Sequence, residues 1–247
     1  DFRLNQQMLE APASADGRIF YARDVRAKIR DYAYTTEDEL YRLHADEISL
    51  ATASRTLKLH KLSLKPQVHS SEYLQKQNFA FSLAEAEINQ ISLEGIDYAA
   101  LLKQDRLHID KIMIDEPVLD VMRDNRLPRD DSRRPPLHQQ MIFSLDQQMD
   151  INQLFIRNGL VRYAERIPDS EDEGVISFEE LNAEIRNISN SPSALRSGLV
   201  MEMDVNARIM GEGQLNASFS FPLDTAAMPF SVKGTLGPMD LTKLNQV

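Results

Sequence analysis

The sequence predicts a mainly β protein in which many bulged, antiparallel strands are joined by turns and a few short helices. One observation is a recurring eight-residue pattern of apolar, polar, apolar, two polar, apolar, polar and apolar residues. Strict copies start at Leu43, Leu57, Ala86 and Ile176, whereas a chain with 42% hydrophobic residues should contain roughly 0.8 copies by chance. The other is the lack of any long amphipathic helix pattern, which excludes a parallel α/β fold covered by crossover helices.

The doubled polar step inside this pattern indicates a β-bulge. Alternate side chains of a strand point to opposite faces, so one extra residue moves all following apolar side chains to the other face. A bulge absorbs the extra residue and keeps the apolar residues together. We therefore expect strands that share one apolar face and one polar face.

The individual elements follow from alternation and turn residues. Asp97 is a suitable N-cap for a short helix at 97–103, and a second short helix is expected at 239–245. Residues 1–24 are expected to be irregular. Strands are predicted at 25–34, 43–52, 56–68, 79–93, 107–122, 141–156, 160–163, 176–188, 199–209, 215–221 and 230–236.

Composition divides the chain into three regions. We predict an N-terminal β-repeat region at 1–122, a charged, proline-containing loop at 123–140, and a β-meander region at 141–247 that continues the first sheet. Five arginines mixed with three aspartates favour a flexible mixed-charge loop over a patch that binds lipid headgroups. These arginines are Arg123, Arg126, Arg129, Arg133 and Arg134.

Charge and composition disfavour several classes of binding partner. A net charge of −10 and a pI near 5.0 disfavour nucleic acid and uniform binding to anionic lipid headgroups. The lack of cysteine excludes disulfides and cysteine-bound metals. No apolar stretch reaches the ~18 residues of a membrane span, and no signal peptide is recognisable. Because the chain begins at Asp1 rather than Met, we expect any membrane anchor to lie outside this sequence.

The sequence carries no recognisable catalytic motif. Its five histidines lack the spacing of a metal site, and Gly-x-Ser-x-Gly, Ser-x-x-Lys and Gly-rich phosphate loops do not occur. We therefore predict that the protein is not an enzyme and uses no metal or cofactor. Two arrangements of the apolar face remain open, namely a closed β-sandwich and a trough that holds an apolar ligand.

Two successive strand units resemble the AsmA-like superfamily of bacterial envelope proteins. In that superfamily, an apolar-x-x-apolar-x-apolar run is followed by a Gly-containing turn, a short helix ending in a Leu pair, and a second strand closed by Pro. The corresponding residues here are Ile88, Ile91, Leu93, Gly95, Leu101, Leu102 and Pro117, and the tail 234–245 is similar to the C-terminal region of the same group.

The resemblance implies an elongated, twisted antiparallel sheet with a hydrophobic groove, located in the periplasm and tethered to the inner membrane. It further implies binding of phospholipid or another acyl lipid, partners among envelope proteins, and a role in intermembrane lipid transport or outer-membrane assembly. The alternative is a closed β-sandwich interaction module. The alternation predicts these groove-lining residues: Leu57, Leu59, Leu62, Leu64, Ile88, Ile91, Leu93, Leu107, Ile109, Ile112, Ile114, Ile151, Leu154, Ile156, Met201, Met203, Val205 and Ile209.

Overall fold

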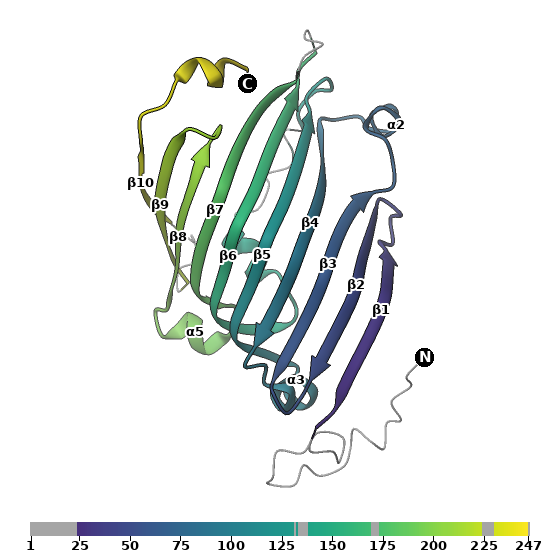
Figure 1. The fold of residues 1–247 in the computed structure, drawn as a ribbon, viewed down its shortest axis with the longest axis vertical. Coiled ribbons are helices and arrows are strands. Elements are labelled where there is room, and N and C mark those ends of the chain that lie inside the picture. The colour runs from purple at the N-terminus through teal and green to yellow at the C-terminus, as the bar shows by residue number, and fades with distance from the viewer. Residues whose placement is uncertain (1–23, 131, 133–137, 169–172, 224–229, 247) are drawn as a thin grey trace.

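Ten strands form one open sheet in which they lie side by side in chain order (Figure 1). The structure is a computed structural model that describes residues 24–130, 132, 138–168, 173–223 and 230–246. The mainly β prediction is confirmed, and the described residues contain no second sheet that would make a sandwich. The strands are β1 (Arg26–Thr35), β2 (Tyr41–Ala51), β3 (Thr56–Pro66), β4 (Phe81–Glu94), β5 (Arg106–Asp124), β6 (Gln148–Arg166), β7 (Gly174–Ser189), β8 (Val200–Ile209), β9 (Gly213–Pro222) and β10 (Ser231–Leu236).

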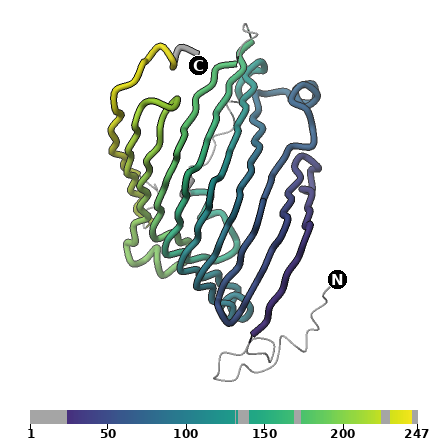
Figure 2. The backbone as a smooth tube through the Cα atoms, in the orientation of Figure 1, coloured from purple at the N-terminus to yellow at the C-terminus, as the bar shows by residue number. Residues whose placement is uncertain are grey.

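The sheet is a single twisted layer, as the backbone trace shows (Figure 2). β1 and β10 are its two edges. The strands on both sides of the charged segment 123–140 belong to this one sheet, and β5 extends into the segment as far as Asp124. Of the region predicted to be irregular, 1–23 lies outside the described residues.

The prediction of an antiparallel sheet is wrong at one place, because β5 and β6 are parallel. All other neighbouring pairs are antiparallel. A parallel pair requires a long crossover connection, and helix α4 (His138–Phe143) lies in this one. The strand predicted to begin at residue 141 therefore begins at Gln148, and the strand predicted at 160–163 is the second half of β6.

The predicted helix after β4 is confirmed as α3 (Tyr98–Gln104). Its N-cap Asp97 accepts a hydrogen bond from the Ala100 backbone N–H at 2.9 Å. Gly95 precedes it with a φ of +73°, and a Cβ there would collide with the carboxylate of Asp110 on β5. This turn therefore requires glycine at position 95.

The remaining helices are short. α2 (Ser70–Gln75), α4 and α5 (Pro192–Arg196) were not predicted, because five or six residues cannot display the helical periodicity of a longer segment. The helix expected at 239–245 is the 3₁₀-helix η1 (Leu241–Gln246).

The two adjacent polar residues of each repeat lie opposite those of the neighbouring strand. Between β2 and β3, Ala45 pairs with Leu62 and Glu47 pairs with His60, so one residue on each strand is passed over. Because both strands carry their extra residue at the same place, the register recovers and the apolar side chains stay on one face. The residues passed over form a line across β1 to β6, which we call the polar seam: Asp31, Asp46, Lys61, Asn89, Glu116 and Asn158.

The polar seam places ordinary residues in the left-handed region of backbone conformation. The φ angles of Asp31, Lys61, Glu116 and Asn158 are 54°, 48°, 51° and 50°. This conformation costs a residue with a Cβ about 1 kcal/mol. The cost is offset by the burial of the apolar residues that the bulge keeps on the correct face.

Deletion of Lys61 should abolish cooperative folding, because it turns the following residues Leu62 and Leu64 to the polar face. Replacement of Lys61→Gly keeps the residue count and relieves the left-handed backbone. It should leave the free energy of unfolding unchanged or raise it by up to about 1 kcal/mol. Urea denaturation of both variants measures this difference. A deletion variant with wild-type stability would contradict the register argument.

Candidate functional site on the apolar face

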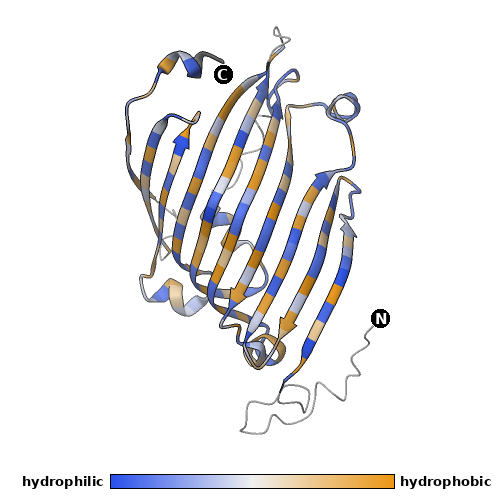
Figure 3. Cartoon of the chain, viewed as in Figure 1, coloured by the Kyte–Doolittle hydropathy of each residue, from blue (hydrophilic) through white to orange (hydrophobic). Residues whose placement is uncertain are grey.

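The apolar side chains form transverse rows that cross the whole sheet. The lower row lies at the end of the sheet next to α3, and each of its members pairs with the next across the strand ladder from β1 to β10. Hydrophobic and hydrophilic positions alternate along each strand as a result (Figure 3). The lower row contains Ala27, Leu50, Leu57, Leu93, Ile112, Leu154, Ile185, Met203, Phe219 and Val232.

Two further rows lie on either side of the polar seam. The middle row is below the seam, toward α3, and the upper row is above it. The middle row contains Ile29, Ile48, Leu59, Ile91, Ile114, Ile156, Ala183, Val205, Ala217 and Gly234. The upper row contains Tyr34, Leu43, Leu64, Ala86, Leu119, Val161, Phe178, Ile209 and Gly213.

Burial differs sharply between the two ends of this face. At the lower end, the buried cluster includes Ile109, which is 1% exposed, and Tyr98 of α3. Ile142 and Phe143 of α4 and Leu195 of α5 pack against the same cluster. The short helices therefore cover the lower end of the apolar face.

From β1 to β6, the middle and upper rows have no comparable cover among the described residues, whereas Leu236 and Met239 lie against Gly213 of the upper row at β9. Large side chains such as Leu59, Ile91 and Leu119 are only partly buried. On edge strand β1, Ile29 is 50% exposed and Tyr34 is 47% exposed. An extended apolar surface is thus accessible on one side of the sheet.

The eighteen predicted groove residues all lie on strands β3 to β8, but they divide into three groups. Ile109, Ile151 and Met201 are in the buried core. Leu57, Leu93, Leu107, Ile112, Leu154 and Met203 are partly buried against that core. The other nine are partly exposed outside the core cluster: Leu59, Leu62, Leu64, Ile88, Ile91, Ile114, Ile156, Val205 and Ile209.

The sequence prediction missed apolar residues of the same face on other strands or farther along the predicted ones. The signal that could have found them is the same alternation, continued through each strand to its upper end. They include Ile29, Tyr34, Leu43, Ile48, Leu119, Val161 and Phe178.

A group of polar side chains ends the apolar face at the upper ends of β4, β5 and β6. Arg123 pairs with Ser82 on β4 and with Glu165 on β6, so all three point to the apolar side. Asn125 accepts a hydrogen bond from Arg123 Nε at 2.8 Å and donates one to Glu165. The Tyr163 hydroxyl donates to Glu165 Oε2 at 3.1 Å. We call these five residues the upper polar cluster.

The environment of Tyr163 opposes its ionisation. Burial raises the pKa of its hydroxyl, and the hydrogen bond to the Glu165 carboxylate raises it further. Tyr163 therefore remains a hydrogen-bond donor at neutral pH, and Glu165 is held in a fixed position beside Arg123.

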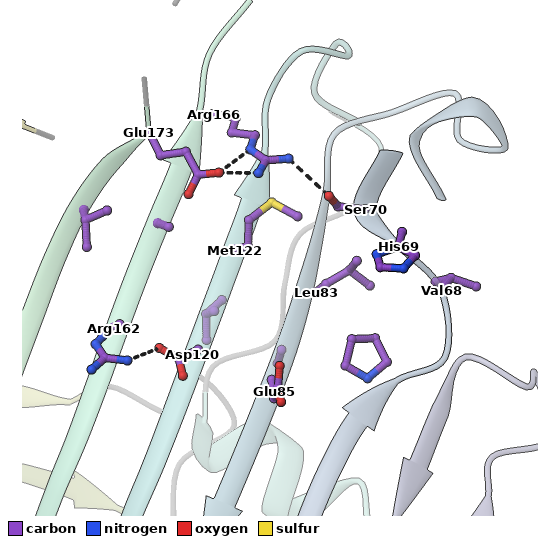
Figure 4. A pocket seen from close by; sticks show the side chains of 15 residues that line it. Val68, His69, Ser70, Leu83, Glu85, Asp120, Met122, Arg162, Arg166 and Glu173 are labelled. Atoms are coloured by element: carbon purple, nitrogen blue, oxygen red, sulfur yellow. Dashed lines mark hydrogen bonds and ion pairs between the residues drawn. The ribbon is translucent and has the colours of Figure 1, made fainter. Parts of the chain in front are cut away.

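A pocket of about 470 Å³ lies on the opposite, polar face beside α2 (Figure 4). Four of its charged side chains form two pairs: Arg166 contacts Glu173 and Ser70, and Arg162 pairs with Asp120. No charge is left to select a charged ligand among these four ionised groups. The one hydroxyl among the described residues that line this pocket, that of Ser70, is bound by Arg166 rather than by a general base.

Close to this pocket, Asp124 is buried at the end of β5. Its carboxylate is fully inaccessible and is bound by Arg126, whose Nε lies 2.9 Å from Oδ1 and whose backbone N–H also donates. These hydrogen bonds lower the pKa of Asp124 below its ordinary value although burial opposes this. Asp124 and Arg126 thus form a structural ion pair at the end of β5.

The described residues provide no obvious place for a metal, because no group of three or more histidine, aspartate or glutamate side chains is suitably clustered. His44 and His108 instead contact Asp31 and Asp110 at 2.9 Å and 3.4 Å. In the same part of the chain, no helix is sufficiently long and apolar to cross a membrane.

In the comparison with known proteins, no family model and no curated protein matches the chain. The class of protein is therefore defined by the structure alone. The chain is a protein with an open, single-layer β-sheet, with short helices over one end of its apolar face and a polar cluster at the other.

Substitution in the two zones of the apolar face should have different effects on stability. Ile109→Asp places a charge in the buried core and should prevent folding, since an unpaired buried carboxylate is strongly unfavourable. Leu59→Asp, on a partly exposed position, should cost about 1–2 kcal/mol and leave the protein folded. Circular dichroism and thermal denaturation distinguish these outcomes, and equal losses would contradict the burial gradient.

Replacement of Arg126→Gln should lower the free energy of unfolding by about 2 kcal/mol at pH 7, because it leaves Asp124 buried without its cation. The pKa of Asp124 is lower when folded than when unfolded. The stabilisation is therefore complete above about pH 4 and disappears as the pH falls through the folded pKa. Urea titrations from pH 7 to pH 3 should show the two proteins converging. Arg162→Gln, which breaks an exposed pair, is the control and should cost under about 1 kcal/mol.

Proposed function

We propose that the protein is an AsmA-like envelope protein that holds phospholipid acyl chains on its apolar face. On this proposal it works in the periplasm, tethered by a segment outside this sequence, and contributes to intermembrane lipid transport or outer-membrane assembly. The observation that carries the proposal is the set of apolar rows that cross the sheet while their large side chains remain partly exposed.

The size of the accessible surface supports a chain-like ligand. Along β5, the eight residues from Ile114 to Val121 span about 23 Å at the rise of a strand. One leaflet contributes about half of the ~30 Å hydrocarbon core of a bilayer. An acyl chain of ordinary length therefore fits along the exposed part of one strand without entering the buried core.

The energetics favour retention of such a chain. Each buried CH₂ group contributes about 0.8 kcal/mol, and the middle row offers a large aliphatic side chain on every strand from β1 to β6. Neighbouring positions across these six strands are therefore nearly equal in free energy, which allows a lipid to move sideways without crossing a large barrier. The superfamily resemblance of the 88–121 units agrees with this use of the face.

The proposal is tested by native mass spectrometry of protein incubated with phospholipid vesicles. Leu59→Asp should lower lipid loading about tenfold, since a carboxylate in the middle row interrupts the apolar surface. The adjacent Lys58→Asp adds a carboxylate on the polar face of the same strand and should load normally. Absence of phospholipid from the wild-type protein, or equal loading of both variants, would refute the proposal.

A further inference from the structure

The two ends of the apolar face differ in chemistry as well as in cover. The lower end is closed by apolar side chains of α3, α4 and α5. The upper end carries a guanidinium, a carboxylate, an amide and two hydroxyls. A ligand with one apolar end and one polar end therefore fits this face in one direction only.

Arg123 is the distinctive member of the upper polar cluster. Its guanidinium contacts neutral partners, namely Asn125 Oδ1 at 2.8 Å and Ser82 Oγ at 3.5 Å. Nearby Arg126, Arg162 and Arg166 each pair with a carboxylate. Among the residues that the structure describes, Arg123 makes no such ion pair, so its positive charge stands at the end of an apolar surface without a bound anion.

Glu165 stands beside Arg123 without neutralising it. The two residues are paired positions on parallel strands, and the side-chain amide of Asn125 lies between them and bonds to both. Tyr163 holds the other carboxylate oxygen. The result is a fixed cation and a fixed anion that are adjacent but separated, which matches a ligand carrying an anion and a cation a short distance apart.

Resting on the proposed function, we infer that the upper polar cluster binds the headgroup of a phospholipid that carries both a phosphate and a primary ammonium. The phosphate lies on Arg123 and the ammonium on Glu165, and the acyl chains run down the sheet toward the short helices. Guanidinium is well suited to phosphate, and a primary ammonium can donate hydrogen bonds to a carboxylate.

The same arrangement discriminates among headgroups. A phosphatidylcholine headgroup has a quaternary ammonium that cannot donate a hydrogen bond to Glu165. A phosphatidylglycerol headgroup has no cation, so its net negative charge meets the Glu165 carboxylate without compensation. The structure therefore favours phosphatidylethanolamine over both.

The test measures loading of the full chain from vesicles of phosphatidylethanolamine, phosphatidylcholine or phosphatidylglycerol with the same acyl chains, and from diacylglycerol. Arg123→Gln should lower phosphatidylethanolamine loading about tenfold and leave diacylglycerol loading unchanged, since a charge-assisted hydrogen bond is lost. Glu165→Gln should lower phosphatidylethanolamine loading to the level of phosphatidylcholine. Arg162→Gln, on the polar face of the same strand as Glu165, is the matched control and should behave as wild type.

Two results would overturn the inference while leaving the proposed function intact. One is equal wild-type loading of the three phospholipids, and the other is an Arg123→Gln variant that behaves like Arg162→Gln. If the wild-type protein loads neither phospholipid nor diacylglycerol, the proposed function fails together with the inference. Circular dichroism of each variant verifies that loading is compared among folded proteins.

Discussion

The whole structure depends on one constraint of backbone register. A strand that gains a residue turns its remaining side chains over, unless the extra residue is absorbed in a β-bulge. Here the extra residue is matched between neighbours, as Asp46 and Lys61 illustrate. The matched bulges keep the middle and upper rows on the same side of the sheet, and every functional argument about that side depends on this.

Uneven burial is the second organising feature. The stable part of the protein is the lower end, where Ile109 and its neighbours are sealed by three short helices. Above it, the described residues leave the apolar face of β1 to β6 without a cover, and the sheet is held by its strand ladder and by side-chain pairs such as Lys65 with Glu85 and Glu87. Stability and ligand-accessible surface are therefore separated along the strands, so substitutions such as Leu59→Asp can change one without abolishing the other.

Alternation and bulge position could be predicted from the sequence because they are local properties of each strand. The N-cap at Asp97 could be predicted for the same reason. The parallel pairing of β5 with β6 could not, since it depends on where a long connection returns the chain. The upper polar cluster was missed because Arg123, Asn125 and Glu165 come together only through that pairing. In the sequence, Arg123 looked like one of several arginines in a charged loop.

The two edges of the sheet have a consequence for its size. Within the part of the chain that the structure describes, the outward backbone of β1 has no neighbouring strand, and the whole strand is exposed, as is β10 at the other edge. Each apolar row is built by one side chain per strand, so its width is set by strand number alone. An eleventh strand with the same eight-residue pattern would widen all three rows at once and leave the existing register untouched. Each duplication of a short segment would thus enlarge the apolar face by the width of one strand.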